Sequence, residues 1–233
     1  MVLPMEHTQQ NSRIRVFENK FSDFLGSEYA IAVPNCRTGL YCVLLSLELN
    51  PGDEVIIPSF TWWTDAAMVI EAGLKPVLVD VSLQSRNISP QLIEEKLTEK
   101  SKVILVTHLN GRPCAMAEIM EIAQKYNLRV IEDCARALGS RTGGKQVGSF
   151  DIGVFSLGFG KSIYSLDGGL VSTDDPTLAK RLQTNLEKII DFCRFQKDAQ
   201  RTIIHNGGYF VSVALTATIV VAKRVFNYVP IIN

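Results

Sequence analysis

The sequence lacks an excess of either charge and lacks cysteine pairs with metal-binding spacing. Among its 233 residues, 24 basic side chains balance 24 acidic ones. This balance excludes nucleic acid and an anionic membrane surface as electrostatic partners and leaves open a small anionic ligand at one local site. The five cysteines are odd in number and never spaced C-x-x-C, so we expect neither a disulfide framework nor a zinc or other metal site. Free thiols inside apolar runs favour a reducing compartment, here the cytoplasm.

Apolar segments long enough to span a bilayer are also lacking, and we expect no signal peptide. The N-terminus shows neither the charged segment nor the apolar segment of a signal peptide. Residues 209–222 are almost wholly apolar and precede Lys223 and Arg224, but the segment is shorter than the ~20 residues that usually span a bilayer. We expect a buried or dimer-facing helix there, with contact at a membrane surface as the less favoured alternative.

What the sequence does contain is a regular alternation of two kinds of segment. Short apolar, β-branched runs predict strands at 54–58, 76–81, 103–107, 129–133, 153–156 and 169–173. Helical patterns lie between several of them, at 39–48, 65–72, 90–97 and 115–126. Beyond residue 173 the alternation stops, and the pattern predicts helices at 177–194 and 209–226 with a loop at 195–208.

Strands that alternate with helices of this length imply right-handed crossovers and a mainly parallel sheet covered on both faces. The fold class is therefore α/β, a three-layer α/β/α sandwich with a helical C-terminal tail. In such sheets ligands bind at the carboxyl ends of the strands. Polar residues do follow those ends, and they direct the search for a site.

Four chemically different side chains follow the predicted strands or begin a helix. Asp133 ends one strand, and Lys161 lies in a glycine-rich loop after the next. Thr38 lies at a helix N-terminus, where free N–H groups favour a phosphate, and Trp62 follows the strand at 54–58. A lysine for an imine, an acid for a ring nitrogen, a phosphate site and an aromatic plane together match the needs of pyridoxal phosphate.

Taken one at a time, these residues have ordinary interpretations. Lys161 alone could be a solvated surface lysine, and Trp62 alone could belong to the core. Asp133 and Thr38 could each be a helix N-cap. Their order and spacing along the chain are what favour the cofactor site.

In that order the chain resembles the DegT/StrS family of pyridoxal-phosphate-dependent sugar-nucleotide aminotransferases, from about residue 29 to 175. The matching stretches are PGDEVIIP at 51–58, FTW at 60–62, AG at 72–73, PV at 76–77, VDV at 79–81, HLNG at 108–111, VIED at 130–133, VGS at 147–149, FS at 155–156, the lysine at 161 and GG at 168–169. The resemblance implies the fold type I large domain, with residues 1–28 as a helical arm, 29–175 as the cofactor-binding domain and 176–233 as a helical tail.

The resemblance also implies a role for each site residue. Lys161 would form the Schiff base and act as acid and base in the proton shift, and Asp133 would pair with the pyridinium nitrogen. Trp62 would stack on the ring, while Thr38 and Ser156 would hydrogen-bond the phosphate. His108 and Glu132 match the family as well, and we expect them to be structural.

The chain departs from the family pattern in several places. Arg37 replaces a glycine beside the phosphate-binding threonine, where it could add charge or block close approach. Arg136 replaces a neutral polar residue near the ring hydroxyl, where it could stabilise the phenolate or compete for Asp133. The loop at 157–160 has two glycines, and Leu166 with Asp167 replaces a glycine-glutamate pair. After residue 175 we find no counterpart of the family's smaller C-terminal domain.

The expected function is amino-group transfer, in amino-sugar or surface-polysaccharide biosynthesis. The donor would be an amino acid, usually glutamate, and the acceptor a keto-sugar nucleotide, in a homodimer with shared sites. One alternative is an impaired relative that binds pyridoxal phosphate or a sugar nucleotide without turnover. Another is a lyase or sugar dehydratase of the same fold, against which Lys161 counts, because the related dehydratases carry histidine there.

Overall fold

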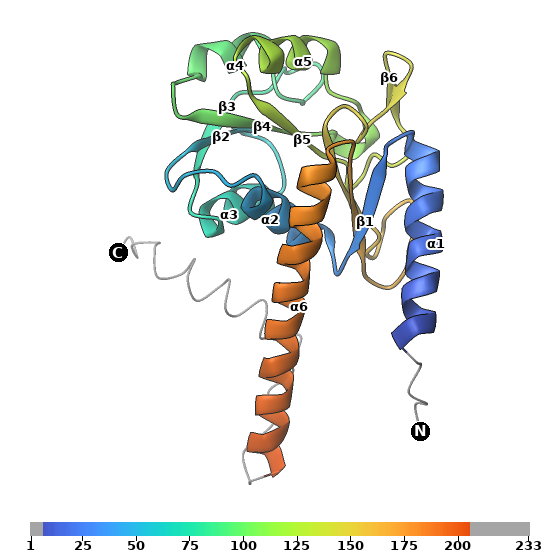
Figure 1. Ribbon diagram of the computed structural model, residues 1–233. Coiled ribbons are helices and arrows are strands. Elements are labelled where there is room, and N and C mark those ends of the chain that lie inside the picture. Colours follow the sequence, from blue (N-terminus) through green and yellow to red (C-terminus); the bar gives the residue numbers. More distant parts are fainter. Residues whose placement is uncertain (1–6, 206–233) are drawn as a thin grey trace.

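The computed structural model describes the backbone of residues 7–205 and the side chains of residues 13–191. Seven strands form one sheet in the order β1-β9-β8-β5-β4-β2-β3 (Figure 1). Their bounds are β1 Tyr29–Val33, β2 Glu54–Pro58, β3 Lys75–Val79, β4 Ser101–Thr107, β5 Arg129–Asp133, β8 Ile152–Ser156 and β9 Gly169–Thr173. A separate short hairpin consists of β6 Arg141–Thr142 and β7 Lys145–Gln146.

The helices cover both faces of this sheet. Their bounds are α1 His7–Leu25, α2 Cys36–Ser46, α3 Thr64–Glu71, α4 Pro90–Lys96, α5 Met116–Lys125 and α6 Pro176–His205, with one 3-10 turn, η1 Leu109–Gly111. Figure 1 shows α4 and α5 on one side of the strands and α2 and α3 on the other. No helix within residues 7–205 is both long and apolar enough to cross a membrane.

The sheet is mainly parallel, as the sequence predicts. Strands β8, β5, β4, β2 and β3 are joined by four parallel pairings. Strand β9 runs antiparallel to both β8 and β1, so β1 points in the same direction as β8. The carboxyl ends of β1, β2, β4, β5 and β8 therefore lie along one edge.

Side-chain alternation divides the core into two layers. Leu105, Ile131 and Val154 pack towards α2, α3 and α6, whereas Val106 and Val130 face α4 and α5. A third cluster lies under α1, where Phe21 packs edge-on against Phe155 of β8 with ring centroids 5.1 Å apart. The three-layer α/β/α prediction is confirmed.

Two predictions about elements were incomplete or wrong. The pattern did not identify β1, a five-residue strand at the edge of the sheet. The loop predicted at 195–208 is wrong as far as His205, because α6 continues to that residue. The segment contains no glycine or proline before Gly207, so its polarity is that of a helix rather than of a turn. The apolar segment at 209–222 lies outside the described residues.

Candidate functional site

The carboxyl edge gathers polar side chains from three neighbouring strands. Thr107, Asp133 and Ser156 are the last residues of β4, β5 and β8. Each lies two positions after an apolar residue that packs towards α2 and α3, so all three belong to that face. The strand-end site expected from the sequence, called the crevice below, thus lies on the α2 and α3 side of the sheet.

Gly169 allows the N-terminus of α2 to lie close to these strand ends. Gly169 pairs with Ser156 on one side and Val33 on the other. A Cβ atom on Gly169 would lie 2.6 Å from the Phe155 carbonyl oxygen and 2.9 Å from the Cys36 nitrogen. Only glycine allows β9 to approach the start of α2 this closely.

Asn35 is the residue that caps α2. Its Oδ1 accepts hydrogen bonds from the Thr38 N–H at 3.0 Å and from the Thr38 hydroxyl at 3.1 Å. Thr38 is therefore not the N-cap, and its hydroxyl points back to Asn35. The first N–H groups of α2 lie outside the intrahelical hydrogen bonds, and with the helix dipole they suit an anion.

Asp133 and Lys161 are brought into electrostatic contact in this crevice. Burial raises the pKa of Asp133, while the hydrogen bond from the Ala135 N–H and the charges of Lys161 and His108 oppose that shift. The Ala135 N–H donates to Asp133 Oδ1 at 2.8 Å, and no helix begins there, so Asp133 is not an N-cap. Among the described residues this carboxylate has no ion-pair partner, so it is suited to meet a cation from a ligand.

Cys36, the first residue of α2, lies among the same charges. Burial raises the pKa of its thiol well above the usual range, and the charges of Asp133 and Asp65 act in the same direction. Lys161 and Arg37 act in the opposite direction. This thiol therefore marks a point within electrostatic reach of both acids and both cations.

Asp65 is a site residue that sequence analysis missed. It lies in the first turn of α3, where an acid is usually explained by the helix dipole, and its side chain is 2% exposed. Burial and the charge of Asp133 raise the pKa of Asp65 to about 7. The sequence contained one sign of it, a single acid directly before the apolar run at 66–70.

The remaining predicted residues lie around the crevice. Trp62 is 67% exposed and so is not a core residue, and its carbonyl accepts from the Asp65 N–H at 3.0 Å. Ser156 Oγ accepts from the Gly158 N–H at 3.4 Å. Arg37 is exposed on the first turn of α2, and Arg136 is exposed in the turn after β5. Of these residues, Arg136 has the weakest connection to the site.

The loop that carries Lys161 is closed by its own backbone. The Leu157 N–H donates to the Gly168 carbonyl at 2.9 Å, and the Ser165 N–H donates to the Leu157 carbonyl at 2.9 Å. Leu166 takes the place of the family's glycine and adopts a left-handed φ of +66°. This loop therefore contains backbone strain at one departure from the family pattern.

Glu132 and His108 form a separate, fully buried network on the other face of the sheet. His108 Nε2 lies 3.0 Å from Glu132 Oε2, and His108 Nδ1 accepts from the Cys114 N–H at 3.0 Å. The Glu132 oxygens also accept from the N–H groups of Gly148 and Phe150 at 2.8 and 2.9 Å. Ligand atoms of His108, Glu132 and Cys134 lie within 4.8 Å of one another, but these bonds already engage His108 and Glu132. The structural role expected for His108 and Glu132 agrees with these contacts.

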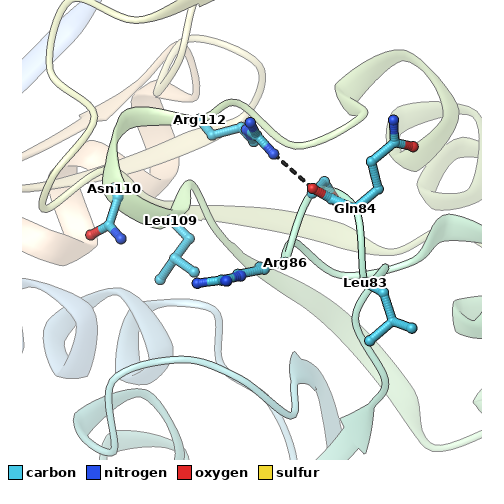
Figure 2. A pocket seen from close by; sticks show the side chains of 7 residues that line it. Leu83, Gln84, Arg86, Leu109, Asn110 and Arg112 are labelled. Atoms are coloured by element: carbon cyan, nitrogen blue, oxygen red, sulfur yellow. Dashed lines mark hydrogen bonds between the residues drawn. The ribbon is translucent and has the colours of Figure 1, made fainter.

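A separate pocket of about 450 Å³ lies beyond the ends of β3 and β4 (Figure 2). Arg112 donates to the Gln84 carbonyl at 2.8 Å, and Figure 2 shows the Arg86 side chain extending towards Leu109. None of the predicted site residues lines this pocket. We therefore place the functional site at the Asp133–Lys161 crevice, where the buried charges are.

Fold and crevice together define an α/β protein with a lysine, a buried acid and a helix N-terminus whose N–H groups suit an anion, all at one sheet edge. The sequence profile of the DegT/DnrJ/EryC1/StrS aminotransferase family matches residues 2–210. The chain belongs to this family. The match extends beyond the 29–175 stretch on both sides, so the expectation that the resemblance fades after residue 175 was too narrow.

Individual relatives agree with this assignment. The chain is 41% identical over 175 residues to a GDP-perosamine synthase of Escherichia coli O157:H7, covering 75% of this chain and 48% of that protein. It is 44% identical over 168 residues to the dTDP-3-amino-3,6-dideoxy-alpha-D-galactopyranose transaminase of Aneurinibacillus thermoaerophilus, covering 71% and 46%. The X-ray structure of the aminotransferase from Psychrobacter cryohalolentis superposes with a TM-score of 0.72 and 40% identity, over 73% of this chain and 44% of that one. The chain spans about half the length of the curated relatives it matches.

Proposed function

We propose that this chain carries the cofactor-binding part of a pyridoxal-phosphate-dependent aminotransferase that acts on a keto-sugar nucleotide. The observation that carries the proposal is the crevice itself, in which the charge of Lys161 acts on buried Asp133 next to the start of α2. Family membership and the named relatives, a perosamine synthase and an amino-sugar transaminase, support the reaction class. In this proposal residues 29–175 form the cofactor domain, 1–28 an arm and 176–233 a tail.

The residues present fit the chemical groups of pyridoxal phosphate. The buried carboxylate of Asp133 suits the ring nitrogen, and the N–H groups at the start of α2 suit the phosphate. The exposed indole of Trp62, which leads directly into α3, offers a flat apolar surface for the ring. Pyridoxal phosphate, when bound, supplies an electron sink for transfer of an amino group.

Each of these residues then has a defined task. Lys161 Nζ would hold the cofactor covalently and would hold and return a proton at that atom. Asp133 would accept a hydrogen bond from the ring nitrogen and keep it protonated, while Trp62 would exclude water from one ring face. Thr38 would hydrogen-bond the phosphate through its hydroxyl.

Three further contacts complete the proposed site. The Ser156 hydroxyl donates to the phosphate from the end of β8. Arg37, on the first turn of α2, adds positive charge to the same anion. Arg136 meets the ring hydroxyl, and its exposure makes it the weakest of these assignments.

The proposal extends to the biological setting. The donor is an amino acid, with glutamate as the first choice, and the active protein is a homodimer in the cytoplasm. The four cysteines whose side chains the structure describes are free, which agrees with a reducing compartment. Amino-sugar or surface-polysaccharide synthesis is the pathway class that uses such a product.

The test is amino transfer by the purified chain with pyridoxal phosphate, glutamate and a panel of GDP- and dTDP-linked keto-sugars. We expect 2-oxoglutarate and an amino-sugar nucleotide in equal amounts, and neither with Lys161→Ala. Lys180→Ala is the control, because this exposed lysine lies on α6 outside the crevice. Bound cofactor without transfer would favour the impaired relative, and a deoxy-sugar product without an amino group would favour a dehydratase. Neither alternative is favoured by the named relatives.

A further inference from the structure

Two buried carboxylates lie at the crevice, although the proposed function uses only one. Asp133 ends β5, and Asp65 lies in the first turn of α3. Thr107 connects them, since it is the register partner of Asp133 on the neighbouring strand and its hydroxyl donates to Asp65 Oδ2 at 3.1 Å. Asp65 therefore bonds to the residue that pairs with Asp133 across the sheet, and the charge of Asp133 acts on Asp65.

Asp65 is held in a triangle of oxygen atoms. Thr61 Oγ1 lies 2.5 Å from Asp65 Oδ2, and the two threonine hydroxyls lie 2.7 Å apart. Two hydroxyls supply two protons for three contacts of hydrogen-bonding length. A third proton, carried by Asp65 Oδ2 and donated to Thr61, completes the triangle, in which Thr61 donates to Thr107 and Thr107 donates to Asp65.

The charged groups around Asp65 also disfavour a second negative charge. Asp133 faces it from β5, and Cys36 lies within reach of both acids from α2. Lys161 and His108 act on Asp133. The cations therefore favour ionisation of Asp133, whereas Asp65 has only hydroxyl partners among the described residues.

We propose that Asp65 is a positioning residue that holds the proton of this carboxylate pair, which leaves Asp133 as the anion available to a ring nitrogen. Part of this inference rests on the proposed function, since the ring nitrogen belongs to the proposed cofactor. The sharing of one proton between the two acids does not depend on any cofactor. The two parts can therefore be tested separately.

The first experiment measures the stability of the full, cofactor-free chain as a function of pH by chemical denaturation. Because folded Asp65 keeps its proton up to about pH 7 while unfolded aspartate loses it near pH 4, the folded chain binds more protons between these values. The stabilisation that the protonated Asp65 contributes is therefore fully present below about pH 4 and is lost as the pH rises towards 7. We expect the unfolding constant to rise up to about tenfold per pH unit in this window.

Asp65→Asn should remove the part of this slope that Asp65 contributes, because an amide cannot ionise yet fits the same space, and the raised pKa of Asp133 accounts for the rest. The matched control is Asp53→Asn, since Asp53 is also buried and binds the Asn50 N–H at 2.8 Å just before β2, at the opposite edge of the sheet. This control should keep the wild-type slope. An equal slope in wild type and Asp65→Asn would overturn the proposal.

Asp133→Asn tests whether the two acids share the proton. Without the Asp133 charge, the midpoint of the remaining Asp65 titration should move to lower pH, and an unchanged midpoint would contradict the pairing. If Asp65→Asn does not fold, the infrared spectrum of the wild-type chain decides. A carboxylic acid band at about pH 6 that vanishes by about pH 9 supports the proposal, and its absence refutes it.

The second experiment adds pyridoxal phosphate. The absorbance spectrum of the wild-type complex should change with an inflection near pH 7 that Asp65→Asn lacks. If the chain binds no cofactor while the cofactor-free titration behaves as expected, the proposed function is wrong. The inference that Asp65 holds the proton of the carboxylate pair is then still supported. If the cofactor binds and both proteins share the same pH profile, the positioning role fails and the proposed function stands.

Discussion

Glu132 and Asp133 are neighbours on β5 and face opposite sides of the sheet. Both are buried, with Glu132 wholly inaccessible and Asp133 9% exposed. Glu132 is bonded to His108 and accepts two backbone N–H groups, so its oxygens are well satisfied. Asp133 accepts one backbone N–H, from Ala135, and otherwise meets only longer-range charges within the described part of the chain.

The difference distinguishes a structural acid from a ligand-binding acid. A buried carboxylate with a complete set of hydrogen bonds holds its surroundings in place. One with an incomplete set is costly in the free protein and gains most when a cation arrives. Of these two adjacent residues, Glu132 therefore stabilises the fold and Asp133 is expected to bind a ligand. Mutations can test the two roles separately.

The largest effect is expected on the Glu132 side. Glu132→Ala leaves His108 and two backbone N–H groups buried without their acceptor, so the free energy of unfolding should fall by about 3–5 kcal/mol. Chemical denaturation measures this change. Glu94→Ala is the control, because Glu94 pairs with Lys125 on the surface and its loss should change stability little. If Glu132→Ala left the free energy of unfolding nearly unchanged, the structural role of Glu132 would be contradicted.

Next in size is a backbone contact on the Asp133 side. Gly169→Ala places a methyl group 2.6 Å from the Phe155 carbonyl oxygen, so the chain should lose about 1–3 kcal/mol of stability or more. Gly158→Ala, in the same region, meets nothing closer than 3.6 Å and should stay within about 0.5 kcal/mol of wild type. The Gly169 variant should also bind pyridoxal phosphate more weakly, because the start of α2 must shift. An unchanged affinity for pyridoxal phosphate would mean that phosphate binding does not need the close approach of Gly169 to the start of α2.

Asp133→Asn should have a smaller effect on stability, with the opposite sign. The pKa of Asp133 is raised in the folded chain, so its ionisation above the unfolded value destabilises the cofactor-free protein. The amide removes that cost, and we expect stability at neutral pH to rise. Pyridoxal phosphate affinity should fall at least about tenfold, the size of one lost charge-assisted contact. Fluorescence titration gives the affinity, and a variant that binds as well as wild type would contradict the role of Asp133.

The smallest effect concerns the loop that carries Lys161. Leu166 is 81% exposed and has a left-handed φ, so Leu166→Gly should raise stability by about 0.5–1 kcal/mol. Leu166→Ala removes the same apolar side chain but keeps the Cβ atom and thus the strain. A glycine variant no more stable than the alanine variant would show that the loop is relaxed at this residue.

The sequence predicted the layers and most of the strands because both depend on local periodicity. It did not identify β1, because a five-residue run at a sheet edge carries too little pattern of its own. It predicted a loop where α6 continues, because polarity alone does not distinguish an exposed helix from a turn.

The site was predictable to the extent that it depends on strand ends. Asp133 and Ser156 end parallel strands, and their convergence follows from topology. Asp65 was not predictable in this way, because its partner Thr107 is 42 residues away and an acid in a first helical turn has an ordinary explanation. The ordinary interpretation of Thr38 as an N-cap is wrong, since Asn35 is the residue that accepts the helix N–H.

The central claim is that Lys161 and Asp133 form a working cofactor site in this chain. Its most direct test is the absorbance spectrum of the purified protein with pyridoxal phosphate, followed by borohydride reduction and peptide mapping. The account predicts a visible band that disappears on reduction, with the cofactor fixed to the peptide that contains Lys161. Folded, soluble protein with no band, or with the label on another lysine, would contradict it.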